Sequence, residues 1–270
     1  MYFDTHAHFD TFVEAGEVDA VLARAAAAGV SNMCAVGGSG LSNEVAVRLA
    51  RVHPEVLVCA VGYDRDQVDK PHDPARLAAL AGEAGVVAIG EIGLDYYYAP
   101  ETATRQRALF EQMLALALDR RRPVVVHSRQ ADGDTRAMLE EFSTEWKKKF
   151  HGVENPPPPG ILHCFTGGAA FAEELLALDM RLSFSGILSF NNAEDLRDTA
   201  RRIPADRLLI ETDCPYLTPK PFRGKGNEPM YVARVADVLA DVRGISVEEL
   251  ATVSTANARA VFQMEDVQDE

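Results

Sequence analysis

The sequence predicts an α/β protein built as a single-domain TIM (β/α)8 barrel. Eight short segments rich in β-branched residues alternate with Ala- and Leu-rich helical segments along the 270-residue chain. A barrel of this kind uses roughly 200 to 250 residues for one core, which fits this length. A doubly wound open sheet produces the same alternation, so periodicity alone leaves both architectures open.

The expected strands are short apolar runs. In chain order they cover residues 2–4, 33–36, 56–61, 86–89, 124–127, 161–163, 182–184 and 208–210. The clearest helices between them end where glycine or proline stops a helix. They cover residues 18–28, 102–120, 135–149 and 229–242.

One compositional break interrupts this alternation, at residues 147–159. A lysine run is followed by Asn155 and four prolines, which would end a helix and stiffen an extended connector. We expect an inserted loop before the sixth strand. A domain boundary is the alternative, but the strand pattern resumes at once with Ile161. The prediction is therefore one domain over residues 1–264, followed by an acidic C-terminal tail at 265–270.

Composition excludes several classes of protein. The formal net charge is −14, and no apolar run approaches the ~20 residues that span a bilayer. The four cysteines lie far apart without a C-x-x-C spacing, which is typical of reduced thiols and indicates a cytoplasmic protein with no membrane partner. The acidic balance argues against bulk electrostatic binding of nucleic acid. A phosphate substrate would need local help, such as a metal.

Metal-binding side chains begin at the end of the first strand. Alternation places Asp4, His6 and His8 on one face, so that two imidazoles point the same way. Imidazole is a preferred ligand of zinc and iron, and a neighbouring carboxylate can orient such a ligand. Two surface histidines beside a turn are the alternative interpretation.

Similar residues recur at the ends of four later strands, namely Glu91, His127, His163 and Asp213. Each alone has a simpler explanation, either a helix cap or a histidine hydrogen-bonded to a loop. In a barrel, however, all carboxyl ends of the strands share the face that carries active sites. Together with His6 and His8, these four residues predict a metal centre of six ligands. Two ions sharing a carboxylate would use six ligands better than one tetrahedral zinc.

Cations near the same face are candidates for binding an anion. Arg129 follows His127 closely, and a rim salt bridge is its alternative role. Arg223 and Lys225 lie in a Gly- and Pro-rich loop after the eighth strand, a region that often binds phosphate in barrels. The remaining histidines, His53, His72 and His151, are assigned to solvent.

Seven motifs together resemble the TatD-type metal-dependent deoxyribonucleases and hydrolases. They run from residue 4 to residue 258: Asp4-Thr5-His6-Ala7-His8, Gly90-Glu91-Ile92-Gly93-Leu94-Asp95-Tyr96-Tyr97, His127-Ser128-Arg129, His163-Cys164-Phe165-Thr166-Gly167, Glu211-Thr212-Asp213-Cys214-Pro215-Tyr216-Leu217, Asn227-Glu228-Pro229 and Asn257-Ala258. Their order and spacing are far more specific than any single motif.

The resemblance implies a TIM barrel with a dinuclear site. One ion would be held by His6, His8, Glu91 and Asp213, and the other by Glu91, His127 and His163, with Glu91 as the bridge. The ions would be Mg²⁺, Mn²⁺ or Zn²⁺, which the sequence does not distinguish.

The chain departs from the family pattern in three places. A His-Pro pair usual after the third strand is replaced in Gly62-Tyr63-Asp64, and the Arg usual before Asn-Glu-Pro is Gly226. Both losses concern expected phosphate contacts, and the departure at Tyr63-Asp64 predicts weaker binding of DNA through a raised KM with kcat less affected. The segment 147–159 is longer than expected and could reshape the rim of the site.

The function implied is metal-dependent hydrolysis of phosphodiester bonds, with nucleotides removed from a DNA end by a metal-activated hydroxide. Asp213 is the candidate general base, and Arg129, Arg223 and Lys225 would contact the DNA or small phosphodiester substrate. An amidohydrolase or esterase acting on a lactone, cyclic amide or acylated RNA is the alternative, favoured by the acidic charge and the lost His-Pro pair. A non-enzymatic scaffold is opposed by six intact ligands. The oligomeric state is left open, and a monomer is compatible with the sequence.

Overall fold

The eight strands form one parallel sheet that curls into a nearly closed barrel. The computed structural model describes residues 1–264, so the predicted acidic tail lies outside the described residues. Neighbours in the sheet follow chain order from β1 to β8. The seam is closed by a parallel bridge between Ala7 and Cys214, beside which the amide of His8 donates to Cys214 O at 2.9 Å. Sequential order with a closing bridge confirms the TIM barrel and excludes the doubly wound sheet.

The strands lie where the sequence predicts them, but several are longer. They are β1 (Tyr2–Ala7), β2 (Val30–Gly38), β3 (Leu57–Tyr63), β4 (Val86–Asp95), β5 (Val124–Arg129), β6 (Gly160–Leu162), β7 (Arg181–Phe184) and β8 (Leu208–Ile210). The prediction ended β1 at Asp4 and β4 at Ile89, just before Gly90 and Glu91. Strand pairing continues past those residues because their side chains are buried, so His6 and Glu91 lie inside strands.

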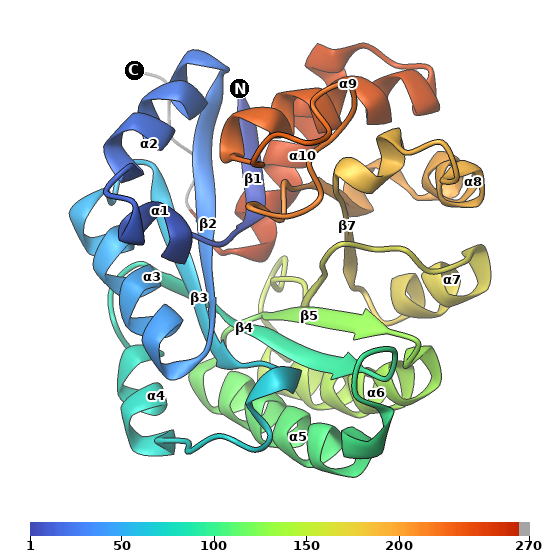
Figure 1. Ribbon diagram of the computed structural model, residues 1–270. Coiled ribbons are helices and arrows are strands. Elements are labelled where there is room, and N and C mark those ends of the chain that lie inside the picture. The colour runs from blue at the N-terminus through green and yellow to red at the C-terminus, as the bar shows by residue number, and fades with distance from the viewer. Residues whose placement is uncertain (265–270) are drawn as a thin grey trace.

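The helices surround the strands (Figure 1). They are α1 (Asp10–Glu14), α2 (Val18–Ala27), α3 (Gly40–Val52), α4 (Pro74–Leu80), α5 (Ala103–Arg120), α6 (Asp132–Lys149), α7 (Ala169–Ala177), α8 (Glu194–Arg202), α9 (Val232–Arg243) and α10 (Val247–Val261). The helix predicted from residue 229 starts instead as a short 3-10 turn, η5 (Pro229–Tyr231), and continues as α9. Within the described residues, no helix is long and apolar enough to cross a membrane.

Two sets of apolar side chains build the core. Alternate strand residues such as Cys59 and Val61 pack outward against the helices. The others, including Cys34, Val58 and Ala60, form a second cluster with the end of α10. There, Phe262 packs on Phe3 with ring centroids 5.5 Å apart. The last helix therefore covers the amino-terminal end of the barrel, which leaves the carboxyl ends of the strands for the site.

The proline-rich segment 147–159 lies at that amino-terminal end, away from the predicted site. It joins α6 to β6, where the indole of Trp146 donates to Pro157 O at 2.9 Å and Val124 N donates to Pro159 O at 3.0 Å. The expectation that it reshapes the rim of the site is wrong, because helix-to-strand connections in a parallel barrel lie at the amino ends of the strands.

Candidate metal centre

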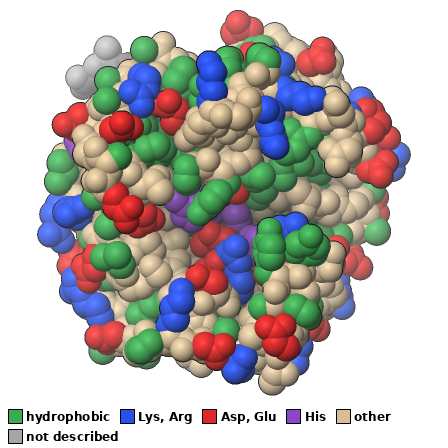
Figure 2. Space-filling view, in the orientation of Figure 1, with side chains coloured by type: hydrophobic (Ala, Val, Ile, Leu, Met, Phe, Trp, Pro, Cys, Tyr) green, Lys and Arg blue, Asp and Glu red, His purple; other side chains and the backbone are tan. Residues whose placement is uncertain are grey.

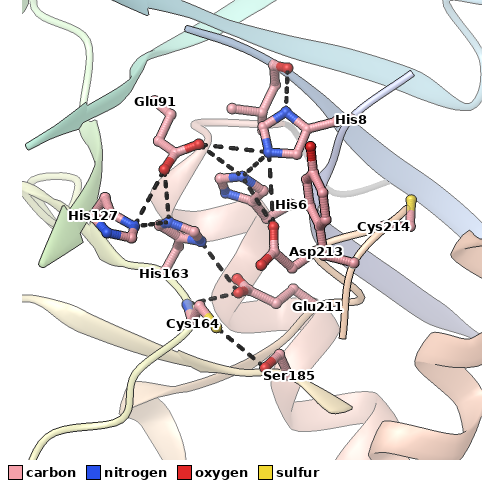
Figure 3. Close-up of polar contacts among 12 residues, drawn as sticks. His6, His8, Glu91, His127, His163, Cys164, Ser185, Glu211, Asp213 and Cys214 are labelled. Carbon is pink, nitrogen blue, oxygen red and sulfur yellow. Dashed lines mark hydrogen bonds and ion pairs between the residues drawn. The ribbon is translucent and has the colours of Figure 1, made fainter. Parts of the chain in front are cut away.

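All six predicted ligand residues meet at the carboxyl ends of the strands (Figure 3). His6, Glu91 and His127 lie within β1, β4 and β5, respectively. The other three, His8, His163 and Asp213, follow β1, β6 and β8 within three residues.

The first group of ligand atoms faces one oxygen of Glu91. The Nε2 atoms of His6 and His8 are 3.1 Å apart, and they lie 3.6 and 3.5 Å from Glu91 Oε2. Asp213 Oδ1 is 3.9 Å from His6 Nε2 and 3.7 Å from His8 Nε2.

The second group faces the other oxygen of the same carboxylate. His127 Nδ1 and His163 Nε2 lie 3.3 and 3.2 Å from Glu91 Oε1, and the two ring nitrogens are 3.3 Å apart. Glu91 is thus placed between two sets of imidazoles and presents one oxygen to each.

These distances fit metal coordination. Donor atoms about 2.0–2.2 Å from a shared ion are separated by roughly 3–3.5 Å in tetrahedral or octahedral geometry. The ligand atoms of His6, His8 and Asp213 lie within 4.8 Å of one another, as do those of His6, Glu91 and His163. Six side chains that could each donate an electron pair therefore converge in a mostly buried space, where ions would join them.

Three of the four imidazoles are also held from behind. His8 Nδ1 lies 3.2 Å from Val36 O, His127 Nε2 lies 3.3 Å from Asp95 Oδ2, and His163 Nδ1 lies 3.4 Å from Glu211 Oε1. Such partners fix the orientation of the ring and the nitrogen left for an ion. Asp95 and Glu211 were not predicted as site residues, although both stand in the quoted motifs. Their signal was a charged residue inside an otherwise apolar strand end.

His6 and His163 are stacked, with ring centroids 3.9 Å apart, but their pKa values are shifted in opposite directions. Burial, assisted by the charge on His163, lowers the pKa of His6 to about 3. Burial also opposes a charge on His163, but the carboxylates of Glu91 and Glu211 outweigh it and raise the pKa of His163 to about 10. Without metal, the centre therefore holds a proton on His163 at neutral pH.

The carboxylates differ in the same way. Burial alone would raise the pKa of Glu91, but Arg65 and His163 hold that pKa well below its usual value. Burial raises the pKa of Asp213 well above its usual value. Glu91 is thus an anion at neutral pH, whereas Asp213 holds a proton more readily, a property suited to a group that accepts one.

Asp4 links β1 to the segment after β8, beneath the centre. Its buried carboxylate accepts hydrogen bonds from Thr212 N at 2.9 Å and Thr212 Oγ1 at 2.5 Å. Burial raises the pKa of Asp4 to about 7 despite these bonds. Asp4 therefore contacts the backbone before Asp213 rather than a histidine ring, and it aligns β1 with the segment after β8.

Two adjoining cavities open above the centre, and histidine side chains are visible near the middle of this face in Figure 2. A cavity of about 570 Å³ contains His127, His163 and Asp213 in its wall, and a second of about 470 Å³ extends over the loops after β1, β2 and β3. The two cavities share four lining residues, His8, Arg65, Glu91 and Tyr216.

The predicted substrate-binding cations separate into two kinds. Arg129 lines the larger cavity, with its guanidinium carbon 4.0 and 4.7 Å from the ring centroids of Tyr97 and Tyr98. Arg223 and Lys225 line neither cavity; their charged groups lie near the rings of Phe190 and Phe222, at 4.2 and 5.8 Å. The loop that carries them does not bring these two side chains to the centre.

The histidines assigned to solvent stay outside the centre, but only His151 is exposed. His53 is half-buried and lies 3.8 Å from Asp19. His72 is also half-buried, because its ring stacks on Tyr63 at 4.6 Å and its Nε2 lies 2.8 Å from Gln67 O. The solvent assignment is therefore wrong for His53 and His72. The burial of His72 could not be predicted without the path of the loop after β3.

Four imidazoles and two carboxylates converge at the strand ends of this nearly closed parallel barrel. Metal-dependent hydrolases use such an arrangement. The sequence profile of the TatD related DNase family matches residues 3–263. The chain belongs to this family of metal-dependent hydrolases.

Relatives and solved structures agree with this assignment. The chain is 42% identical over 266 residues to the uncharacterized metal-dependent hydrolase YcfH of Escherichia coli K12, covering 97% of this chain and 96% of the relative. It is 33% identical over 269 residues to the 3'-5' ssDNA/RNA exonuclease TatD of Pantoea vagans, covering 97% and 99%. The crystal structure of YJJV, a TatD homolog from Escherichia coli K12, superposes with a TM-score of 0.86 at 28% identity, covering 98% of both chains.

Proposed function

We propose that this enzyme is an exonuclease that hydrolyses phosphodiester bonds at the end of single-stranded DNA or a related small phosphodiester, using two divalent ions. The observation that carries the proposal is Glu91, whose two oxygens each face a separate pair of histidines. A relative that shares nearly the whole chain is named a 3'-5' ssDNA/RNA exonuclease, which supports the choice of substrate.

The ions, of which Mg²⁺, Mn²⁺ and Zn²⁺ are the candidates, would lower the pKa of a bound water and offset the charge that develops on the phosphoryl oxygens. His6, His8, Glu91 and Asp213 would hold one ion, and Glu91, His127 and His163 the other. Asp213, which would lie next to that water as a ligand, would then receive the proton of the attacking water.

The mouth of the centre suits a single strand. Tyr98 and Tyr216 line the larger cavity and are 71% and 62% exposed, which leaves ring surface available for base stacking. Arg129 beside Tyr98 adds a positive charge for the backbone. The four cysteines are free, as expected for the cytoplasmic location that we propose.

The test is hydrolysis by protein loaded with each metal in turn. Substrates would be a 5'-labelled single-stranded DNA, bis(p-nitrophenyl) phosphate, p-nitrophenyl acetate and a lactone. We expect stepwise shortening of the DNA, abolished by chelation and restored by added metal, with two ions per chain in calorimetric titration. Failure to bind any ion in a folded sample would refute the proposal.

An amidohydrolase or esterase activity on the same centre remains the second candidate. The observation that favours it is the smaller cavity, whose wall includes Asp10, Glu14, Asp64 and Asp66. Such a wall repels a polyanionic strand and accepts hydrogen bonds from neutral polar substrates. Turnover of the lactone or acetate ester without shortening of DNA would select this candidate.

A further inference from the structure

Arg65 occupies the junction of the two cavities above the metal centre. It begins the 3-10 turn η1 (Arg65–Gln67), which is separated from β3 by Asp64 alone, and its side chain is 26% exposed. Of the four residues that line both cavities, Arg65 is the one with a permanent positive charge. The Arg65 side chain therefore borders both cavities that lead to the ligands.

The contacts of Arg65 place its charge beside the predicted ions. Its Nη1 donates to Glu91 Oε1 at 2.6 Å, the same oxygen that faces His127 and His163. The guanidinium also forms an ion pair with Asp64, which is 5% exposed. An arginine has five N–H donors in a planar fork, and the hydrogen bond to Glu91 uses Nη1 alone, so donors on the other nitrogens can bind an oxyanion.

The loop after β3 holds this arrangement in place. Tyr63 is buried with its ring stacked on His72, and its hydroxyl accepts from Asp73 N at 3.0 Å and lies 3.3 Å from Asp73 O. The sequence alone suggested that this segment had lost a phosphate contact, with Tyr63 and Asp64 facing the substrate. Tyr63 is instead turned into the loop, and Arg65 supplies a cation.

We propose that Arg65 binds an anionic phosphoryl oxygen of the substrate beside the metal centre, and that Asp64 positions the Arg65 guanidinium. This inference deepens the proposed function and rests on it for the identity of the anion. The inference also explains how an anionic substrate could bind beside the acidic wall of the smaller cavity. The charged group nearest the ligand Glu91 is the positive guanidinium of Arg65.

The test compares Arg65→Gln with Arg76→Gln. Arg76 lies on α4 of the same β3–β4 connection and pairs on the surface with Glu44, so this control removes the same charge outside both cavities. In metal-loaded protein, we expect Arg65→Gln to weaken calorimetric binding of inorganic phosphate roughly tenfold to a hundredfold, the value of a charge-assisted hydrogen bond. KM for bis(p-nitrophenyl) phosphate should rise by a similar factor with kcat less affected. Arg65→Lys should recover part of the loss.

Divalent-ion affinity distinguishes substrate binding from a structural role. Removing a cation 2.6 Å from Glu91 Oε1 should raise the affinity of Arg65→Gln for Mn²⁺ by roughly tenfold or more, because that cation repels the ion. If Arg65 instead served to hold Glu91 in place, the affinity would fall. A fall in Mn²⁺ affinity, or phosphate binding equal to that of the unsubstituted protein, would overturn the proposal.

Asp64→Asn tests the positioning role. It should raise KM several-fold while kcat and the number of bound ions stay unchanged, whereas a purely structural defect would lower kcat or metal binding as well. Failure of the proposed function is separable: Arg65-dependent phosphate binding without phosphodiester turnover would leave the anion site standing and remove the nuclease. Turnover of DNA with KM unaltered in Arg65→Gln would leave the nuclease standing and remove the anion site at Arg65.

Discussion

Gly93→Ala should dismantle one half of the metal centre by steric contact alone. Gly93 lies in β4 between Glu91 and Asp95, and its φ of +140° is a conformation that L side chains rarely adopt. A Cβ at this position would lie 2.0 Å from His127 O and 2.9 Å from the N and C atoms of the same residue. Since an ordinary contact begins at 3.4 Å, the strand bearing His127 would have to move by 3.4 − 2.0 = 1.4 Å.

That displacement is large relative to the geometry it disturbs, because His127 Nδ1 lies 3.3 Å from Glu91 Oε1. A misplacement of about 1 Å costs roughly a hundredfold in rate, and the backbone conformation costs a further ~1–3 kcal/mol of stability. At about 2–4 °C per kcal/mol for a domain near this size, we expect Tm to fall by roughly 2–12 °C. Calorimetry should detect weaker binding of the second ion, and hydrolysis should fall at least about a hundredfold.

Gly133→Ala is the matched control. Gly133 is exposed near the start of α6, and a Cβ there meets nothing within 4 Å, so the same substitution should leave metal binding and rate unchanged. Its Tm should stay equal or rise slightly, because alanine favours the helix. Two ions bound with unaltered affinity in Gly93→Ala would refute the reasoning, since the strand could then absorb a Cβ without moving its ligand.

Three further predictions concern individual groups of the centre. Asp213→Asn removes the proposed base and should lower kcat by roughly 10² to 10⁴, measured with metal at saturation; a rate equal to that of the unsubstituted enzyme would assign the proton transfer elsewhere. Asp95→Asn removes the carboxylate 3.3 Å from His127 Nε2 and should weaken metal affinity roughly 10- to 100-fold in calorimetric titration, with a change below twofold counting against an orienting role. Because the pKa of His163 is raised to about 10, its ring is protonated below that pH, and coordination through Nε2 must displace the proton. Metal affinity should therefore rise by up to about tenfold per pH unit between pH 6 and 9, with proton release measurable in buffers of different ionisation enthalpy; affinity independent of pH would contradict the protonation of His163.

The sequence predicts the barrel and the convergence of the six candidate ligand side chains well, because both depend on local order. Strand and helix segments alternate in a fixed pattern, and a parallel barrel brings every strand end to one face. His163 and Asp213 could thus be placed together without knowing a single distance. Strand ends were less predictable, because a polar residue such as Glu91 normally marks the end of an apolar strand, and only burial reveals that pairing continues.

Long-range contacts explain what the sequence did not reveal. Glu211 was overlooked because its role depends on His163, which comes from a different strand. Arg65 was overlooked because its contact with Glu91 depends on the path of the loop after β3, which Tyr63 and His72 determine by stacking. The segment 147–159 leads from a helix into β6, so it lies at the amino-terminal end of the barrel. The order of helices and strands indicates this position, whereas the composition of the segment does not.

The pairing of Asp4 with Thr212 also bears on when the enzyme can acquire its ions during synthesis. The two residues are 208 positions apart, and His6 and Asp213 flank them on the same two segments. A nascent chain cannot bring these ligands together until β8 has left the ribosome, and the barrel lacks its lower cover until α10 follows. His6 and His8 thus remain without Asp213 through nearly the whole of translation. The ion held by His6, His8, Glu91 and Asp213 would therefore meet its full set of ligands only in nearly finished chains, whereas the ligands of the other ion, Glu91, His127 and His163, are synthesised earlier.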